Sequence, residues 1–207
     1  MKHFFDNANP FFRAMNVAFN LIIINLLTLL CSLPLVTIGT ALAAANTVLT
    51  SMVEGQEGYP SRQFFQAFRK NLRQGVLSFL VFLLGAFVLG VDLYGSIRLM
   101  QGVFRRIFLV TTSLLIVIYA VILFYFYIFL SRYEDSQKTT LKNAAAASVA
   151  YFPRTVGMMV IAVAFLALYL RFFLYAVPFI ILLGFSLPQY CCALLFVPIF
   201  QQIEKDR

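Results

Sequence analysis

Residues 30–46 read LCSLPLVTIGTALAAAN and end a long apolar run that begins at Val17. Three interpretations fit this stretch: a signal-peptide cleavage region, the end of a single membrane anchor, or the bend of a helical hairpin that re-enters the membrane. A signal peptide has an apolar region of about 7 to 15 residues. Here the apolar character continues with few breaks to Leu42, so we expect the segment to remain in the mature chain.

A proline marks the bend within this stretch. Pro34 lacks a backbone N–H and disfavours a helical conformation at Leu33. The first helix is therefore expected to end near Ser32, and Thr37 is expected to cap a second helix over 38–53.

The second helix is rich in small residues. Gly39, Ala43 and Thr47 recur every four residues, a spacing that lets helix backbones approach closely in lipid. At about 1.5 Å per residue the helix is only some 25 Å long. We expect it to need neighbouring helices on both sides.

Composition places the chain among membrane proteins. Hydrophobic residues make up 62% of it and charged residues 12%, against about half and a quarter in soluble domains. The segments 76–91, 107–130 and 156–170 carry no charged residue, and a bilayer needs about 20 apolar residues per helix. The sequence predicts an all-α, polytopic helical membrane protein with one integral membrane domain over 1–207.

Six membrane spans are predicted. They cover 15–33, 37–54, 75–97, 106–130, 154–172 and 186–203. If the second helix crosses, twelve of the 16 lysine and arginine residues lie on one side, and only Arg98, Arg105, Arg106 and Arg171 lie on the other. Without that crossing the division is ten against six. The positive-inside rule prefers the first arrangement, which gives a bacterial inner-membrane protein with both termini cytoplasmic.

The course of 172–186, as a bent extension or a re-entrant segment, stays open.

The segment 61–74 predicts an amphipathic helix lying in the cytoplasmic interface. Phenylalanines repeat every four residues on one face, and basic residues gather on another. The rings are expected in the acyl boundary and the bases toward lipid phosphates or a partner. This candidate interfacial or partner-binding surface comprises Phe64, Phe68, Arg69, Lys70 and Arg73. The aromatic run FYFYIF at 124–129 is similarly expected to form an interfacial belt.

Short echoes suggest a degenerate duplication. NLRQ at 71–74 aligns with FPRT at 152–155, and the triplet SLP occurs at both Ser32 and Ser186. Because both basic segments are predicted on the same side, the repeat would be parallel, with halves 55–131 and 132–207.

Polar residues inside the spans are candidates for function or for helix packing. Asp92 either forms an ion pair with Arg98 or Arg171 that steadies a helix end, or serves a substrate or a proton. On the first helix, Asn16 and Asn20 share one face.

Asn25 lies on another face of the first helix. A continuous pore lining is therefore not predicted, and hydrogen bonding across helices is the structural interpretation. Asn46 of the second helix is the candidate partner.

The sequence shows no group of residues typical of an enzyme active site. The chain has one histidine, His3, and three cysteines, Cys31, Cys191 and Cys192. The cysteines are interpreted as small buried residues, with a vicinal redox pair as the alternative. No metal, cofactor or catalytic activity is predicted.

The stretches FFRAMNVAFNLIIINLLTLLCSLPLVTIGTALAA (11–44), FFQAFRKNLRQG (64–75) and LKNAAAASVAYFPRT (141–155) resemble the YesL family. These are bacterial integral membrane proteins whose function is not established, and the resemblance is strongest over 10–80. Genes of this family often accompany carbohydrate transporters of the ATP-binding-cassette (ABC) type and glycan-degrading enzymes. The resemblance implies an auxiliary component of sugar uptake or of its regulation.

The leading hypothesis is an accessory protein that binds the bilayer and a membrane transporter subunit, and no nucleic acid. The alternative is an autonomous transporter or channel for a small solute. It would use Asn16, Asn20, Asn46 and Asp92.

Overall fold

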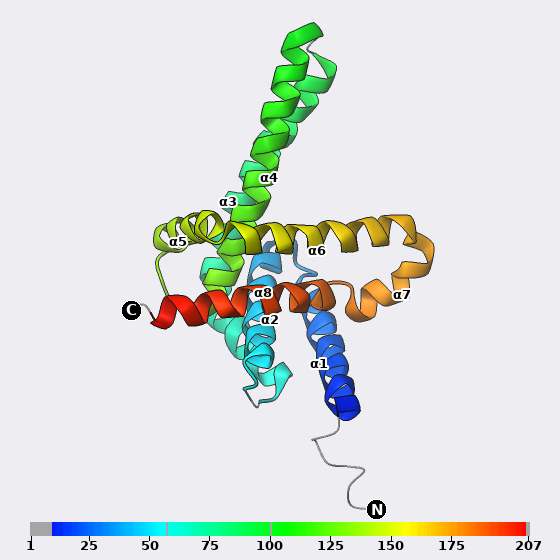
Figure 1. Cartoon of the computed structure of the whole chain (residues 1–207), viewed down its shortest axis with the longest axis vertical. Helices are drawn as coiled ribbons and strands as arrows, with labels where there is room; N and C mark the ends of the chain where they lie inside the picture. Colours follow the sequence, from blue (N-terminus) through cyan, green and yellow to red (C-terminus); the bar gives the residue numbers. More distant parts are fainter. Residues whose placement is uncertain (1–9, 57, 100, 206–207) are drawn as a thin grey trace, which may run out of the picture.

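The computed structural model describes residues 10–56, 58–99 and 101–205. These residues form eight α-helices and one short 3-10 helix, and they contain no strand (Figure 1). The elements are α1 (Pro10–Cys31), η2 (Leu35–Thr37), α2 (Ile38–Val53), α3 (Pro60–Arg98), α4 (Gly102–Arg132), α5 (Gln137–Ala150), α6 (Phe152–Arg171), α7 (Phe173–Leu183) and α8 (Ser186–Lys205). The predicted all-α fold is confirmed.

The helices have the length and composition of a polytopic membrane protein. Among the described residues, five segments are long and apolar enough to cross a bilayer: Ala14–Cys31, Leu35–Val53, Pro60–Arg98, Gly102–Arg132 and Phe152–Arg171. A sixth is counted if Val177–Leu183 and Ser186–Gln202, bent by 47° at their junction, form one span. The segment between α6 and α8 is therefore a separate helix, α7, joined to α8 at a bend.

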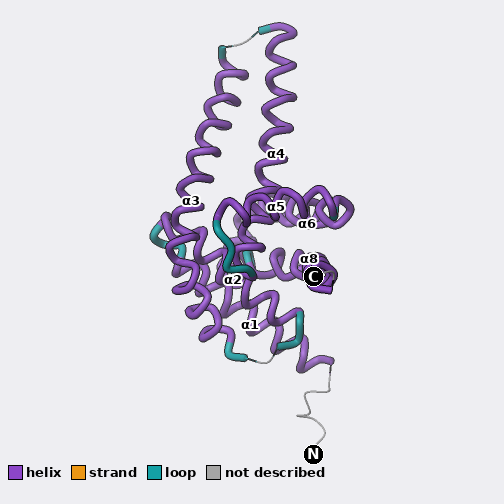
Figure 2. The backbone as a smooth tube through the Cα atoms, turned by 90° about the vertical axis from the view of Figure 1, so that its left-hand side faces the viewer, coloured by secondary structure: helices purple, strands orange, loops and turns teal. Residues whose placement is uncertain are grey.

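The helices run in two directions. α3 and α4 form a long antiparallel hairpin whose tip extends beyond every other element (Figure 1). α6 and α8 lie across this hairpin, and both are seen almost end-on after a quarter turn (Figure 2). α1 and α2 lie beside the lower half of the hairpin. The core sits there, because α2 contacts α1, α3, α4 and α8. The expectation that α2 needs several neighbours is confirmed.

The bend after α1 follows the proline, but its cap differs from the prediction. Pro34 is extended (φ −74°, ψ 109°), and α1 ends at Cys31, next to the expected Ser32. Thr37 occupies the predicted N-cap position of α2, but its hydroxyl accepts no hydrogen bond from the first turn of that helix. It donates instead to the carbonyl oxygens of Cys31 and Pro34, each at 2.7 Å. The turn of η2 already holds Thr37 in a helical conformation, so its side chain closes the bend.

α2 and α3 approach closely through glycine. A Cβ atom on Gly75 would lie 2.5 Å from Thr40 Oγ1 and 2.7 Å from Thr40 Cα. A Cβ atom on Gly39 would lie 2.5 Å from the Gly75 carbonyl oxygen and 2.6 Å from the Tyr127 hydroxyl. Only residues without a side chain fit at this contact, which agrees with the small-residue spacing of α2.

The predicted interfacial helix is not a separate element. α3 continues without a break for 39 residues, about 58 Å, so the amphipathic segment is simply its first third. Phe64, expected among lipid acyl chains, is fully buried in the protein core, and Phe68 stacks beside it with ring centroids 6.2 Å apart. Phe64 is buried because the face of α3 on which it lies packs on α2. Toward the hairpin tip this face continues with small residues. Its buried members are Ala67, Asn71, Gly75 and Ser78.

The basic residues of the same segment lie on the surface. Arg69, Lys70 and Arg73 are exposed, and Lys70 pairs with Glu134 in the connection between α4 and α5. The basic face is therefore exposed, as expected. The phenylalanine face of the same segment packs on the protein and not on lipid.

The aromatic belt expected at 124–129 also lies inside the protein. Tyr125, Phe126, Tyr127 and Phe129 are all buried, because α2, α3, α5 and α8 surround the last turns of α4. Arg132 at the end of α4 pairs with Glu54 and lies 5.0 Å from the ring centroid of Phe200. This cluster joins α2, α4 and α8.

The two predicted repeats differ in their helices. α3 passes through 71–74 without interruption, whereas the second basic segment is divided at Tyr151 (φ −108°, ψ 41°) into α5 and α6. The duplication remains a prediction from sequence.

Candidate functional site

Asn25 of α1 holds the junction between α7 and α8. Its Nδ2 donates to the carbonyl oxygens of Ile180 (3.1 Å) and Ile181 (2.7 Å). Its Oδ1 accepts from the backbone N–H groups of Phe185 (2.9 Å) and Ser186 (3.0 Å). The side chain is fully buried. One carboxamide thereby satisfies four backbone groups of a helix break.

A helix break inside apolar surroundings needs such a partner. Most of the last carbonyls of α7 and the first N–H groups of α8 have no backbone partner, although Ile180 also accepts the N–H of Gly184 at 3.0 Å. Unsatisfied backbone groups are costly where water is absent. A carboxamide offers two donors and an acceptor, so asparagine matches both helix ends together. The structure therefore assigns Asn25 a packing role.

A second buried amide pair joins α2 to α8. Gln189 Nε2 donates to Asn46 Oδ1, and both side chains are buried. The expected pairing of Asn46 with polar residues of α1 is therefore not formed. Sequence reasoning missed Gln189. The feature that could have identified Gln189 is its polar amide in an otherwise apolar segment.

The remaining polar candidates do not converge. Asn16 is exposed and Asn20 half-buried on α1. Asp92 is exposed near the opposite end of the molecule, in the part of α3 that leads to the hairpin tip (Figure 1). No ion pair joins Asp92 to Arg98 or Arg171 in the described part of the chain. The four residues of the transporter alternative thus occupy separate places.

The cysteines form no disulfide bond in the described part of the chain. Cys192 is buried, Cys31 and Cys191 are half-buried, and all three are free thiols. No cluster of three histidine, cysteine or acidic residues suits a metal ion within residues 10–56, 58–99 and 101–205. His3 lies outside the described residues.

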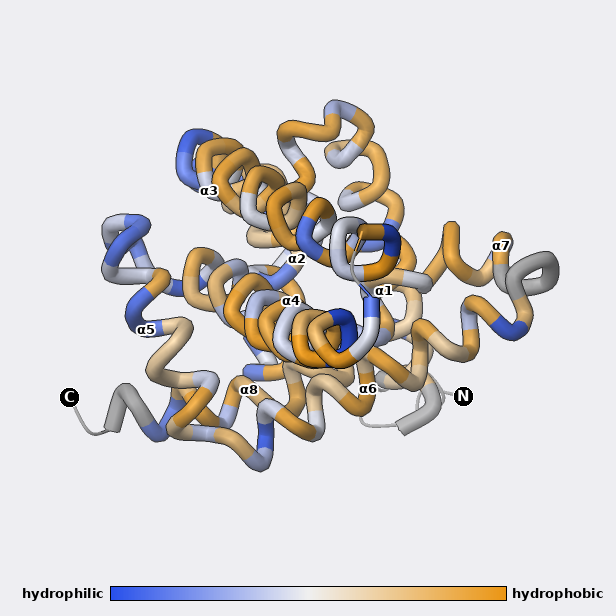
Figure 3. Tube along the Cα trace, turned by 90° about the horizontal axis from the view of Figure 1, so that it is seen from above, coloured by the Kyte–Doolittle hydropathy of each residue, from blue (hydrophilic) through white to orange (hydrophobic). Residues whose placement is uncertain are grey.

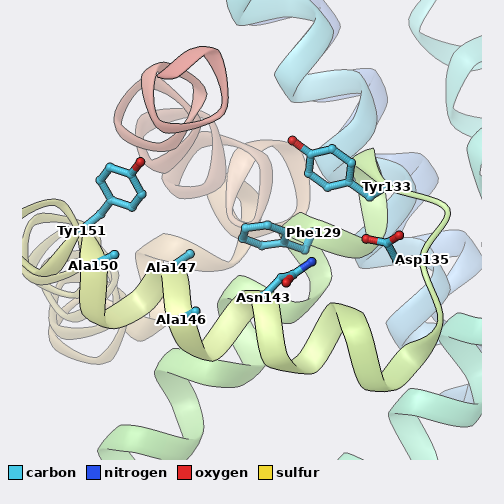
Figure 4. A pocket seen from close by; sticks show the side chains of 8 residues that line it. All are labelled: Phe129, Tyr133, Asp135, Asn143, Ala146, Ala147, Ala150 and Tyr151. Atoms are coloured by element: carbon cyan, nitrogen blue, oxygen red, sulfur yellow. The ribbon is translucent and has the colours of Figure 1, made fainter. Parts of the chain in front are cut away.

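A cavity of about 250 Å³ lies where α4 leads into α5 (Figure 4). Figure 4 shows three aromatic rings around it, two polar side chains, and small side chains along α5. Its lining consists of Phe129, Tyr133, Asp135, Asn143, Ala146, Ala147, Ala150 and Tyr151. Phe129 belongs to the aromatic run that was expected to face lipid, and five further lining residues lie in the segment 141–155 quoted for the family resemblance. None of them was predicted to line a cavity.

Two larger hollows are apolar grooves on the helix surfaces. One, of about 570 Å³, lies between α4 and α6, and the other, of about 550 Å³, lies between α3 and α4. Figure 3 shows the same contrast: α5 mixes hydrophilic and hydrophobic residues, whereas most of α6 is hydrophobic. The cavity at α5 therefore differs in chemistry from the grooves that face the apolar surroundings.

Comparison with known proteins gives a family without an assigned activity. No curated protein and no solved structure matches the chain significantly. Residues 21–93, from α1 through the bend to most of α3, are similar to a family described as "Protein of unknown function, DUF624". This matched region contains the Pro34 bend and the Gly39–Gly75 contact.

Proposed function

We propose that the chain is a YesL-type accessory protein of a bacterial inner membrane, without catalytic activity of its own. Its partner is the membrane-embedded subunit of an ABC-type carbohydrate-uptake transporter. The resemblance to the YesL family supplies the class of partner, and the DUF624 match is compatible with it. The observation that carries the proposal is the projecting α3–α4 hairpin.

The hairpin presents apolar side chains that no other helix covers. Phe82 and Tyr119 pack edge to face across it, with ring centroids 5.8 Å apart. Toward the tip, Leu84, Phe87 and Val110 are 66%, 68% and 70% exposed. In lipid, helices associate through close packing, so the uncovered outer faces of these two apolar helices suit contact with another membrane protein.

Small residues on α3 support this assignment. A Cβ atom at Gly90 or at Gly95 would have no neighbour within 4 Å, so both glycines are open on the hairpin surface. Glycine on an exposed apolar helix lets a partner helix approach its backbone closely. The hairpin therefore combines bulky side chains with places for close contact.

An autonomous transporter is less well supported. Asn46 is bonded to Gln189, while Asn16 and Asp92 lie at opposite ends of the molecule. The carboxamide of Asn25 is fully used at the α7–α8 junction. A solute path would need polar side chains that these residues do not provide.

We propose an orientation with the hairpin base in the cytoplasm. Exposed basic residues gather at the base, on α3 and α5; they are Arg62, Arg69, Lys70, Arg73, Lys138 and Lys142. Arg98, Arg105 and Arg106 lie near the tip. Arg171, grouped with them from sequence, ends α6, away from the tip (Figure 1). The excess at the base accords with the positive-inside rule.

Cysteine labelling tests this orientation. In a chain whose three native cysteines are replaced by alanine, Gln101→Cys at the tip should react with a membrane-impermeant maleimide on intact cells. Gln56→Cys, in the loop between α2 and α3, should react only after permeabilisation. Both positions are exposed. The reverse pattern would invert the proposed orientation.

Co-purification tests the partner. The full chain, captured in mild detergent from its native host, should bring down the membrane subunit of a sugar transporter. The double substitution Leu84→Ala/Phe87→Ala should reduce the recovered subunit at least tenfold, because large exposed side chains dominate binding at interfaces. Leu166→Ala/Leu170→Ala on α6, also highly exposed, is the matched control and should leave recovery unchanged.

Two results would contradict the proposal. One is the absence of any transporter subunit among the captured proteins. The other is solute flux by the chain alone in proteoliposomes that Asp92→Asn abolishes, since that would favour the transporter.

A further inference from the structure

The cavity between α4 and α5 has no part in the proposed docking surface. The hairpin tip lies far from it (Figure 1), and its lining mixes aromatic, polar and small side chains in one open hollow. A hollow with convergent polar groups among apolar ones is the usual form of a small-molecule site.

Aromatic rings stand on two opposite sides of the cavity. Phe129 and Tyr133 stack with ring centroids 5.8 Å apart and planes inclined by 30°, and Tyr151 stands on the opposite side of the cavity (Figure 4). The wall from α5 consists of Ala146, Ala147 and Ala150. Alanine leaves the space between the rings open, so a flat apolar face of a ligand can lie against them.

Two polar side chains lie beside Phe129 and Tyr133 (Figure 4). The carboxylate of Asp135 and the carboxamide of Asn143 lie near each other in Figure 4. The neighbouring Glu134 is paired with Lys70, whereas Asp135 forms no ion pair in the described part of the chain. Its backbone carbonyl oxygen is held by Gln74 Nε2 at 3.4 Å. Together the two side chains offer several acceptors and two donors.

The surrounding charges select the class of ligand. An anion would meet the Asp135 carboxylate inside the cavity. A cation would meet the Arg154 guanidinium, which lies 5.9 Å from the Tyr151 ring centroid. A neutral molecule with hydroxyl groups on one side and a C–H face on the other fits both walls.

Size narrows the class further. A volume of about 250 Å³ equals that of about eight water molecules in the liquid, which is enough to hold one small ring. We propose that this cavity binds a neutral monosaccharide, with its hydroxyls on Asp135 and Asn143 and its ring face on Phe129. The site stands on its own lining and does not depend on the transporter partner.

Isothermal titration calorimetry on the full chain in nanodiscs tests the site without any partner protein. The probes are D-glucose, D-galactose, D-mannose and myo-inositol, with choline as the cation and D-glucuronate as the anion. At least one neutral hexose should bind saturably. Asp135→Asn and Asn143→Ala should each weaken binding about tenfold or more, as expected when a hydrogen-bonding partner is removed. Ala150→Phe, which fills the cavity, should abolish it.

Matched variants separate the site from general effects. Asp92→Asn makes the same chemical change at an exposed carboxylate outside the cavity, and Ala86→Phe adds the same ring to an exposed position of α3. Both should bind the hexose like the unaltered chain. Absence of binding by every neutral sugar, preferential binding of choline or glucuronate, or binding that survives Ala150→Phe would each overturn the proposal. None of these results would bear on transporter co-purification.

Discussion

Replacing Asn25 with alanine is expected to lower the free energy of unfolding by about 2 to 4 kcal/mol. The change removes four hydrogen bonds from the α7–α8 junction. The N–H groups of Phe185 and Ser186 and the carbonyl oxygen of Ile181 lose this partner, whereas the carbonyl oxygen of Ile180 keeps the N–H of Gly184. Individual interhelical hydrogen bonds in membranes contribute about 0.6 kcal/mol on average to stability. The expected loss is larger here because all four bonds support the same helix junction. Equilibrium unfolding in mixed micelles measures the effect.

Two further variants sharpen this test. Asn16→Ala, at an exposed position of the same helix, should change stability by less than about 0.5 kcal/mol. Asn25→Asp keeps the acceptors for Phe185 and Ser186 but loses the donors to Ile180 and Ile181, so it should also destabilise. If Asn25→Ala unfolds like Asn16→Ala, the junction does not depend on the carboxamide.

The features predicted correctly from sequence have local causes. Pro34 ends α1 because it acts on its own neighbours, and the apolar segments give membrane helices because their length matches a bilayer. The small-residue spacing of α2 indicated close helix contact. It did not identify the contacting helix, since Gly75 lies in a different apolar segment.

The errors concern what covers a helix face. A repeat of phenylalanines every four residues fits a face on lipid and a face on protein equally well, because both environments are apolar. Phe64 and Phe129 were expected at the interface and are buried in the core. In a soluble protein such a repeat would point to the core, but this inference fails when lipid is also present.

The polar sites depended on distant partners. Asn25 meets Phe185 and Ser186, which lie 160 and 161 positions further along the chain, so its polarity was visible but its role was not. The α4–α5 cavity is local in sequence, from Phe129 to Tyr151. The cavity was missed because the aromatic run at 124–129 was expected to face lipid.

Replacing Gly75 with alanine is expected to destabilise the fold by about 1 to 3 kcal/mol, and replacement with leucine should prevent folding. The new Cβ atom would lie 2.5 Å from Thr40 Oγ1, 2.7 Å from Thr40 Cα and 2.8 Å from Thr40 N. Because two of these atoms are backbone, α2 must move away from α3. That displacement would disturb Phe64 and the other core residues between the two helices. Unfolding in mixed micelles measures the loss.

A glycine elsewhere on α3 provides the control. Gly90→Ala introduces the same methyl group into the same helix, where nothing lies within 4 Å, so stability should stay equal or rise by up to about 1 kcal/mol. The double variant Gly75→Ala/Thr40→Ala should remain destabilised, because shortening Thr40 removes its hydroxyl but not its backbone atoms. Full recovery in that double variant would show that the Thr40 side chain, and not the approach of the two helix backbones, requires glycine at this position.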